Sequence, residues 1–167
     1  MLAPFVLLVA LTSSPRTVVA KFFAVYIKQE TYGLLEGKNR EQLKPFLSRR
    51  LLKQLDDVVA CEKDWERQQP KDSTDKPPYI DCCLFSIPDG MPTSYHVASV
   101  EKQEDGRYKV IVNLKMDAGG DHIAWREAMI VVREGEGFRI DDAYDPDRDS
   151  TTLTLQFTEC KDGKWMP

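Results

Sequence analysis

Gly137-Phe138-Arg139-Ile140-Asp141-Asp142-Ala143-Tyr144 is the stretch that decides the fold, because it closes a series of segments with strand periodicity. Before it, residues 94–103, 107–116 and 122–133 carry apolar side chains at alternate positions or in runs. Short turns that contain glycine separate these segments, as in antiparallel hairpins. The sequence therefore predicts an antiparallel sheet of about four strands. The two adjacent aspartates of the last strand should point to opposite faces of the sheet.

The chain before the sheet has helical periodicity instead. Residues 15–32 place apolar side chains three and four positions apart, after Ser14, which can cap a helix and is followed by a proline. A short helical turn at residues 41–47 leads to Ser48, a second capping residue, before a helix predicted to end at about Gln69. Helices that precede an antiparallel sheet indicate an α+β domain.

Length and charge limit the class of protein. A chain of 167 residues, 42% of them hydrophobic, can bury the core of a single domain, which we place at residues 14–167. Lys and Arg total 23 against 27 Asp and Glu, so nucleic acid, which favours basic domains, is not an expected partner. The proline-rich residues 70–78 are predicted to form a loop inside this domain.

The N-terminus predicts the compartment. Residues 2–11 are apolar apart from Pro4, and this run is too short to cross a bilayer. It is typical of the core of a secretory signal, although no Lys or Arg precedes it. We therefore interpret residues 1–13 as a leader and expect an exported, soluble protein of the periplasm without a transmembrane segment. A buried segment of a cytoplasmic protein is the alternative.

Four cysteines, Cys61, Cys82, Cys83 and Cys160, fit an oxidising compartment and are candidates for disulfides. Of the three pairings, the one that joins Cys82 to Cys83 needs a strained eight-membered ring. The other two connect this dipeptide to the helix of Cys61 and to residues 150–161, which fit either a strand or a helical face and whose threonines favour a strand. Free buried thiols and a metal site are the alternatives. No Cys-x-x-Cys spacing exists, so we expect no metal.

Several loose motifs together carry a resemblance. They are Ser14-Pro15 with the aromatic residues that follow, residues 43–55, Asp81 before an aromatic loop, and residues 138–142. In these the chain resembles a family of small bacterial envelope proteins of unknown function, itself similar to the cone-shaped, nuclear-transport-factor-2-like α+β fold. The resemblance implies helices packed into the concave side of a curved sheet. It extends more weakly to immunity proteins that block cell-wall amidases of type VI secretion.

Cones of this kind can hold a general base in an apolar pocket, as isomerases and dehydratases require. The candidates for such a pocket are His96, Trp125 and Asp141, but nothing in the sequence brings His96 near a carboxylate. No nucleophile motif such as Gly-x-Ser-x-Gly is present. We therefore expect no enzymatic activity and no cofactor. A cone interior that binds a small molecule, or acts on it as an isomerase or dehydratase does, is the alternative.

The last candidate site is the acidic segment at residues 141–149, which holds five aspartates. Carboxylates resist burial unless they are paired, so we expect an exposed loop at one end of the sheet. Its Asp145, Asp147 and Asp149 would steer a cationic partner. The sequence thus favours a non-enzymatic, exported binding protein, with an envelope protein such as a cell-wall amidase effector as partner and inhibition or immunity as role. A solvated loop without a partner is the alternative.

Overall fold

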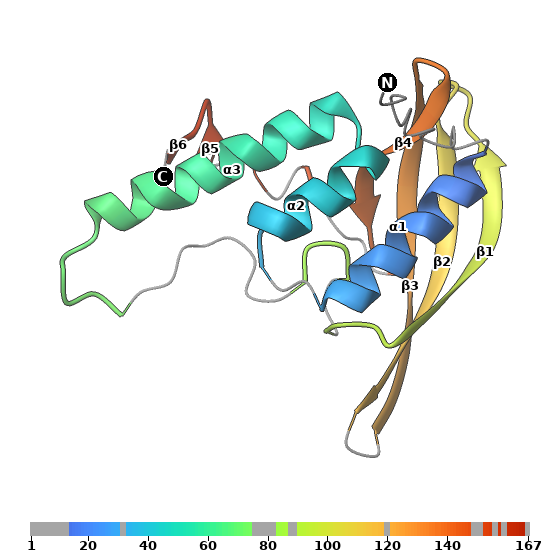
Figure 1. The fold of residues 1–167 in the computed structure, drawn as a ribbon, viewed down its shortest axis with the longest axis horizontal. Coiled ribbons are helices and arrows are strands. Elements are labelled where there is room, and N and C mark those ends of the chain that lie inside the picture. The colour runs from blue at the N-terminus through green and yellow to red at the C-terminus, as the bar shows by residue number, and fades with distance from the viewer. Residues whose placement is uncertain are drawn as a thin grey trace, which may run out of the picture.

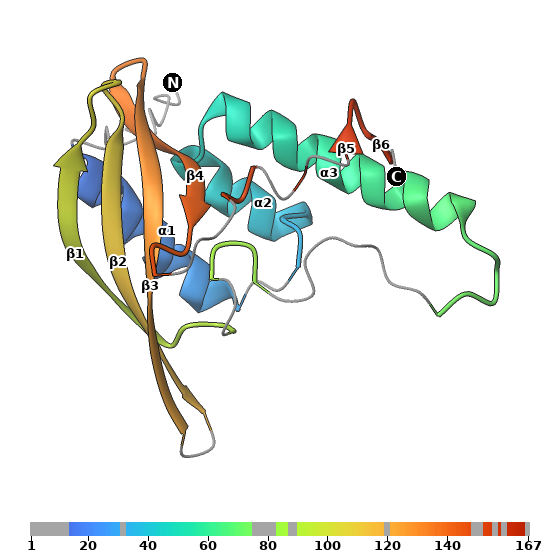
Figure 2. The same ribbon diagram turned by 180° about the vertical axis from the view of Figure 1, so that it is seen from behind.

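The computed structural model describes residues 14–30, 33–74, 83–86, 90–118, 121–147, 152–154, 157 and 160–165. They form the α+β fold that the sequence predicts, in which helices that come first along the chain pack on a four-stranded antiparallel sheet (Figure 1). The view from behind shows α1 on one face of the sheet only (Figure 2). The predicted leader, residues 1–13, lies outside the described residues.

Capping residues and apolar stripes define the helices. The helical elements are α1 (Pro15–Gln29), α2 (Gly37–Leu43), the 3-10 turn η1 (Lys44–Phe46) and α3 (Arg49–Gln68). Ser14 and Ser48 cap α1 and α3 as predicted, since their hydroxyls accept hydrogen bonds from the backbone amides of Thr17 and Leu51. No helix in the described part of the chain has both the length and the apolar character of a membrane span.

The four predicted strands are confirmed, and each pairs with its neighbour along the chain. They are β1 (Ser94–Lys102), β2 (Tyr108–Ala118), β3 (Asp121–Glu134) and β4 (Gly137–Tyr144). On β2 the inward positions Val110, Val112 and Leu114 are fully buried, as the alternation predicts. We call the face that packs on α1 the inner face and the opposite one the outer face.

In its described residues, 152–154, 157 and 160–165, the C-terminal segment does not continue the four-stranded sheet. Residues 152–154 form a turn beside β4, where the Leu153 amide donates a hydrogen bond to the Ala143 carbonyl at 2.7 Å. Two short strands, β5 (Cys160–Lys161) and β6 (Lys164–Trp165), make a separate hairpin that contacts α3. The threonines are therefore a poor guide here, because they serve as turn and hydrogen-bonding residues.

Each of the two edge strands, β1 and β4, contains a bulge that alters the predicted alternation. In β4, Ile140 lies opposite Val131 while Asp142 lies opposite Ile130, so Asp141 is an extra residue. Both aspartates are buried, at 7% exposure each. The sequence predicts that only one of them points inward, and the pairing of Asp142 with Ile130, between two core positions of β3, agrees with this; contacts with Thr154 bury Asp142 as well.

The β1 bulge lies between Val97 and Ser99, at the free edge of the sheet. The guanidinium of Arg16, in the first turn of α1, donates hydrogen bonds to the carbonyls of Val97 and Ala98.

The main core fills the space between α1 and the inner face. Phe22, Phe23, Tyr26 and Phe85 are fully buried and contact one another edge-on or stacked, with ring centroids 4.8 to 6.2 Å apart in the described pairs. Burial of each such ring contributes about 2 kcal/mol or more to stability. Beneath α1 the interior of the fold is therefore occupied by packed side chains.

Candidate functional site

Asp141, one of the predicted pocket residues, ties β4 to the start of α3. Its carboxylate accepts a hydrogen bond from the Ser48 hydroxyl at 2.5 Å and from Arg50 Nε at 3.0 Å to both oxygens. Arg50 Nη2 also binds the Asp141 carbonyl at 2.5 Å. The same Ser48 hydroxyl caps α3, so one hydrogen-bonded cluster, buried except for Arg50, joins the bulge to the helix N-terminus. This arrangement gives Asp141 a structural role.

Asp142 is also satisfied by partners inside the fold. Its carboxylate accepts hydrogen bonds from the Ala143 amide at 2.9 Å, the Thr154 amide at 3.1 Å and the Thr154 hydroxyl at 2.6 Å. It thereby fastens the turn at residues 152–154 to the end of β4. The two adjacent aspartates hold two different segments against the same strand.

The rest of the acidic segment is only partly exposed. Asp145 is buried at 8% exposure, and its carboxylate accepts a hydrogen bond from the Asp147 amide at 2.8 Å. The exposed Asp147 pairs with Arg126, whose Nε lies 2.8 Å from its Oδ2, and this hydrogen bond lowers the pKa of Asp147. The prediction of an exposed loop is thus correct for Asp147 and wrong for Asp145. Asp149 lies outside the described residues.

The structure does not bring the three predicted pocket residues together. His96 is exposed on β1 and lies in register with Asn113, which in turn pairs with Arg126 on the outer face. Trp125 is buried on the inner face, and Asp141 is bound to α3. Of the three, Trp125 alone belongs to the candidate site described next.

Glu127, which sequence reasoning missed, is the most unusual residue of the inner face. It lies opposite the core residue Val112, is 2% exposed, and its Oε2 has no hydrogen-bond partner. Two positions earlier on the same face, the indole Nε1 of Trp125 is also buried without a partner. In the described part of the chain only four buried side-chain nitrogen or oxygen atoms lack a hydrogen-bond partner, and these are two of them. Each such atom costs about 1 to 3 kcal/mol.

Asp145 completes this group. The pairing of Ala128 with Tyr144 places Glu127 and Asp145 next to each other where β4 ends. Burial, and secondarily the charge of Asp145, raise the pKa of Glu127 to about 8, so its carboxyl is protonated at neutral pH. We name Trp125, Glu127 and Asp145 the Glu127 cluster. It combines a free acceptor, a free donor and a second carboxylate at one end of the sheet.

The sequence held one signal for this cluster. Trp125, Met129 and Val131 alternate as inward residues, and Glu127 occupies the inward position between them, where an apolar side chain is expected. A charged residue on the core face of a strand needs a partner, and its lack of one is visible only in three dimensions.

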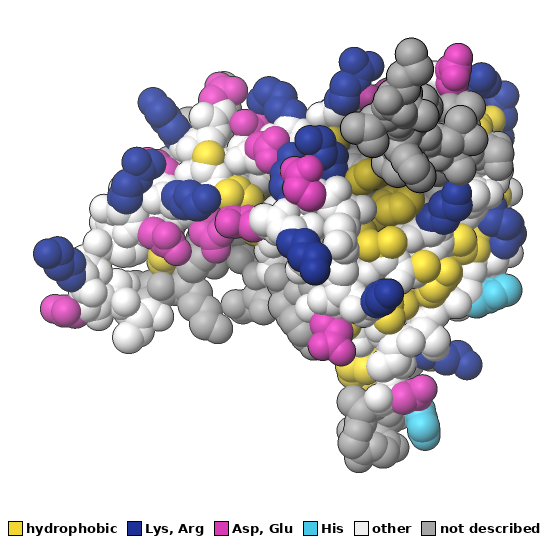
Figure 3. Space-filling model, viewed as in Figure 1, with side chains coloured by type: hydrophobic (Ala, Val, Ile, Leu, Met, Phe, Trp, Pro, Cys, Tyr) yellow, Lys and Arg dark blue, Asp and Glu magenta, His cyan; other side chains and the backbone are white. Residues whose placement is uncertain are grey.

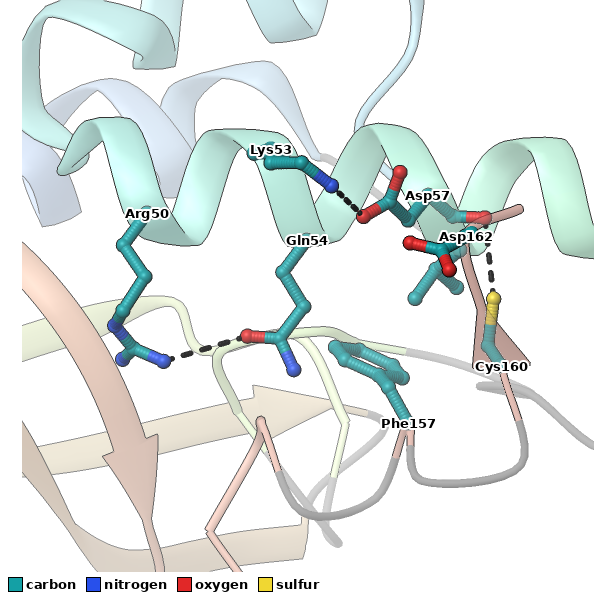
Figure 4. A pocket seen from close by; sticks show the side chains of 8 residues that line it. Arg50, Lys53, Gln54, Asp57, Phe157, Cys160 and Asp162 are labelled. Carbon is teal, nitrogen blue, oxygen red and sulfur yellow. Dashed lines mark hydrogen bonds and ion pairs between the residues drawn. The ribbon is translucent and has the colours of Figure 1, made fainter.

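A hollow of about 290 Å³ lies between α3 and the C-terminal segment, away from the Glu127 cluster (Figure 4). Its lining side chains are Arg50, Lys53, Gln54, Asp57, Val58, Phe157, Cys160 and Asp162. Lys53 and Asp57, one turn apart on α3, form an ion pair of 2.6 Å on one side of it. Charges of both signs are interspersed along the neighbouring helical surface (Figure 3). The hollow therefore selects for neither anions nor cations.

The remaining candidates concern cysteines and metals. Cys61, Cys83 and Cys160 carry thiols, while Cys82 lies outside the described residues. Within the described ranges, no group of three or more His, Cys, Asp or Glu side chains could hold a metal ion.

A comparison with protein families and with curated proteins found no match to this chain.

Proposed function

We propose that this protein is an exported binding protein without catalytic activity, and that the Glu127 cluster receives a small organic cation that also carries a hydrogen-bond acceptor. An amino alcohol is the simplest compound of this class. The observation that carries the proposal is the pair of buried, unpartnered atoms, Glu127 Oε2 and Trp125 Nε1, on neighbouring inward positions of β3.

The charge of the ligand follows from the two carboxyls. Burial, and secondarily the charge of Asp145, raise the pKa of Glu127, so an ionised Glu127 is both poorly solvated and repelled by Asp145. A bound ammonium group would relieve that repulsion and donate the hydrogen bond that Glu127 Oε2 lacks. A neutral ligand would leave the cost of ionising Glu127 unchanged.

The acceptor and the size of the ligand follow from Trp125 and from the burial of the cluster. The indole Nε1 only donates, so it needs an oxygen of the ligand, such as a hydroxyl. Glu127, Trp125 and Asp145 are 2%, 9% and 8% exposed. A site this enclosed suits a small molecule better than a protein side chain on a rigid partner surface.

The sequence-based hypothesis of an envelope partner, such as a cell-wall amidase effector, has less support. It depends on accessible carboxylates at Asp145, Asp147 and Asp149. Of the two that the structure describes, Asp145 is buried and the exposed Asp147 already binds Arg126. A cationic partner would have to displace that guanidinium. Inhibition or immunity through this loop remains a prediction.

The test is an NMR titration of the full chain with ethanolamine, followed at the indole N–H resonance of Trp125. The substitution Trp125→Phe identifies that resonance. The indole of Trp65, in the last turn of α3, serves as an internal control. We expect the Trp125 resonance to move on titration and that of Trp65 to stay. If only ionised Glu127 binds the cation, the apparent affinity should rise about tenfold per pH unit between pH 6 and 8.

Two comparisons make the test specific. Ethylamine has the charge without the acceptor and ethylene glycol has the oxygen without the charge, so both should bind at least tenfold more weakly than ethanolamine. Glu127→Gln should abolish the pH dependence, whereas Glu136→Gln, at the exposed turn between β3 and β4, should preserve it. An immobile Trp125 resonance, or equal binding by both variants, would refute the proposal.

A further inference from the structure

The C-terminal hairpin places Cys160 directly on α3. Its Sγ donates a hydrogen bond to the Asp57 carbonyl at 3.2 Å (Figure 4). In an α-helix this carbonyl also accepts from the amide four residues later, which belongs to Cys61. The side chain of Cys61 is also close enough to raise the pKa of the Cys160 thiol, after the larger effect of burial. Two cysteines 99 positions apart in sequence thus meet at one turn of the helix.

The turn of the hairpin holds this position. Gly163 connects β5 to β6 with φ +72°, a left-handed conformation that suits glycine. A Cβ atom at Gly163 would lie 3.0 Å from the Cβ of Ala60, so the hairpin backbone approaches α3 closely next to Cys61. Neither cysteine can move far from the other without separating the hairpin from the helix.

We propose that Cys61 and Cys160 form a disulfide that fastens the C-terminal hairpin to α3. This pairing differs from the two that the sequence favoured, both of which use Cys82 and Cys83. Cys83 is 2% exposed and lies in a bridge with Gly33, in another part of the fold. The disulfide between Cys61 and Cys160 involves neither Cys82 nor Cys83.

The order of the chemical steps follows from exposure. Cys160 is partly exposed and lines the hollow beside α3, while Cys61 is fully buried. With glutathione disulfide as oxidant, the Cys160 thiolate attacks one sulfur and releases the first glutathione thiolate. The Cys61 thiolate then attacks Cys160 Sγ in the mixed disulfide and releases the second. The two cysteines lose two protons and two electrons, and the two glutathiones gain them.

The folded thiols should react slowly. Burial, and secondarily the side chain of Cys61, raise the pKa of Cys160 to about 12, so its thiolate is scarce at neutral pH. The disulfide should therefore form mainly while the chain folds in an oxidising compartment. Refolding from the reduced, unfolded chain is the condition in which to look for it.

The connectivity can be read directly. The full chain is reduced, unfolded, refolded in a glutathione redox buffer, blocked with an alkylating agent and digested without reduction for mass spectrometry. We expect a peptide that links Cys61 to Cys160, whether or not Cys82 and Cys83 are also joined. A link from Cys61 or Cys160 to either member of that dipeptide, or four alkylated thiols, would overturn the proposal.

Thermal unfolding of two variants gives an independent readout. A cross-link that closes so long a loop should raise the melting temperature by on the order of 10 °C, so a reductant should lower it by that amount. Cys160→Ala should remove this response to reductant, and Cys82→Ala should keep it. The opposite result, a response lost in Cys82→Ala and kept in Cys160→Ala, would contradict the assigned pairing.

Discussion

Two pairs of buried carboxyls lie close together near the C-terminal end of β4, and only one pair has all its hydrogen bonds supplied by the fold. Asp141 and Asp142 accept hydrogen bonds from a helix cap, an arginine and a turn. Glu127 and Asp145 are buried to a similar degree, but Glu127 Oε2 has no donor. Burial alone therefore does not identify a functional carboxyl. The difference lies in whether the fold itself supplies the hydrogen bonds, and each prediction below tests that difference.

Loss of the Asp141 carboxylate should have the largest effect. Asp141→Ala leaves the Ser48 hydroxyl and the Arg50 guanidinium without their buried acceptor, so the free energy of unfolding should fall by about 3 kcal/mol. Urea denaturation measures this change. Asp141→Asn keeps one oxygen acceptor and should cost clearly less. Equal stability of the Ala variant and the unmodified protein would show that these bonds contribute nothing.

Substitution of Glu127 should have the opposite sign and a smaller size. Its pKa is raised to about 8 in the folded protein from an ordinary value of 4.5. Between these values the unfolded chain loses the proton while the folded protein keeps it, so stability falls as pH rises from about 4.5 to 8. Glu127→Gln removes this loss, about 3 kcal/mol at pH 7, but buries an amide without a partner, so the net stabilisation should be about 2 kcal/mol.

Urea denaturation at pH 5, 7 and 8.5 would check the Glu127 prediction. The gain in stability of Glu127→Gln over the unmodified protein should grow with pH and level off above about 8. Glu136→Gln, an exposed control, should follow the unmodified protein at every pH. A gain that is independent of pH would mean that Glu127 titrates normally and is not held in its neutral form.

The exposed ion pair should have the smallest effect. Asp147→Asn removes the carboxylate that binds Arg126, but both side chains are about half exposed, so solvent screens their interaction. We expect a nearly unchanged urea midpoint. At low salt, a partner that uses this loop should associate more slowly with Asp147→Asn than with the unmodified protein. Stopped-flow association would detect this difference once a partner is identified. A large loss of stability would instead place Asp147 with the structural aspartates.

The sequence predicts most of the fold because local signals decide it. Ser14 and Ser48 start their helices where a capping hydroxyl precedes an apolar stripe, and the alternation along β2 assigns its inner face correctly. These features depend on neighbours within a few residues. Such short-range patterns are visible without coordinates.

The candidate site was not predictable in the same way. A bulge at Asp141 has no local signature, and alternation along the strand does not predict that both adjacent aspartates are buried. Glu127 did interrupt an apolar alternation, but the identity of its neighbour, Asp145, depends on the register of two strands. The meeting of Cys61 with Cys160 likewise depends on where a C-terminal hairpin docks. All three depend on contacts between distant parts of the chain.

The bond from Arg16 to the β1 bulge has a consequence for self-association. The free edge of a sheet exposes backbone groups that another chain can use to add a strand, and such edges promote aggregation. At β1 the Arg16 guanidinium donates hydrogen bonds to the carbonyls of Val97 and Ala98. The bulge also interrupts the regular spacing of backbone hydrogen-bonding groups that an incoming strand requires. A positive charge at that edge also disfavours a second copy of the same edge. One arginine of the first helix thus occupies part of the edge at which another chain would have to add a strand.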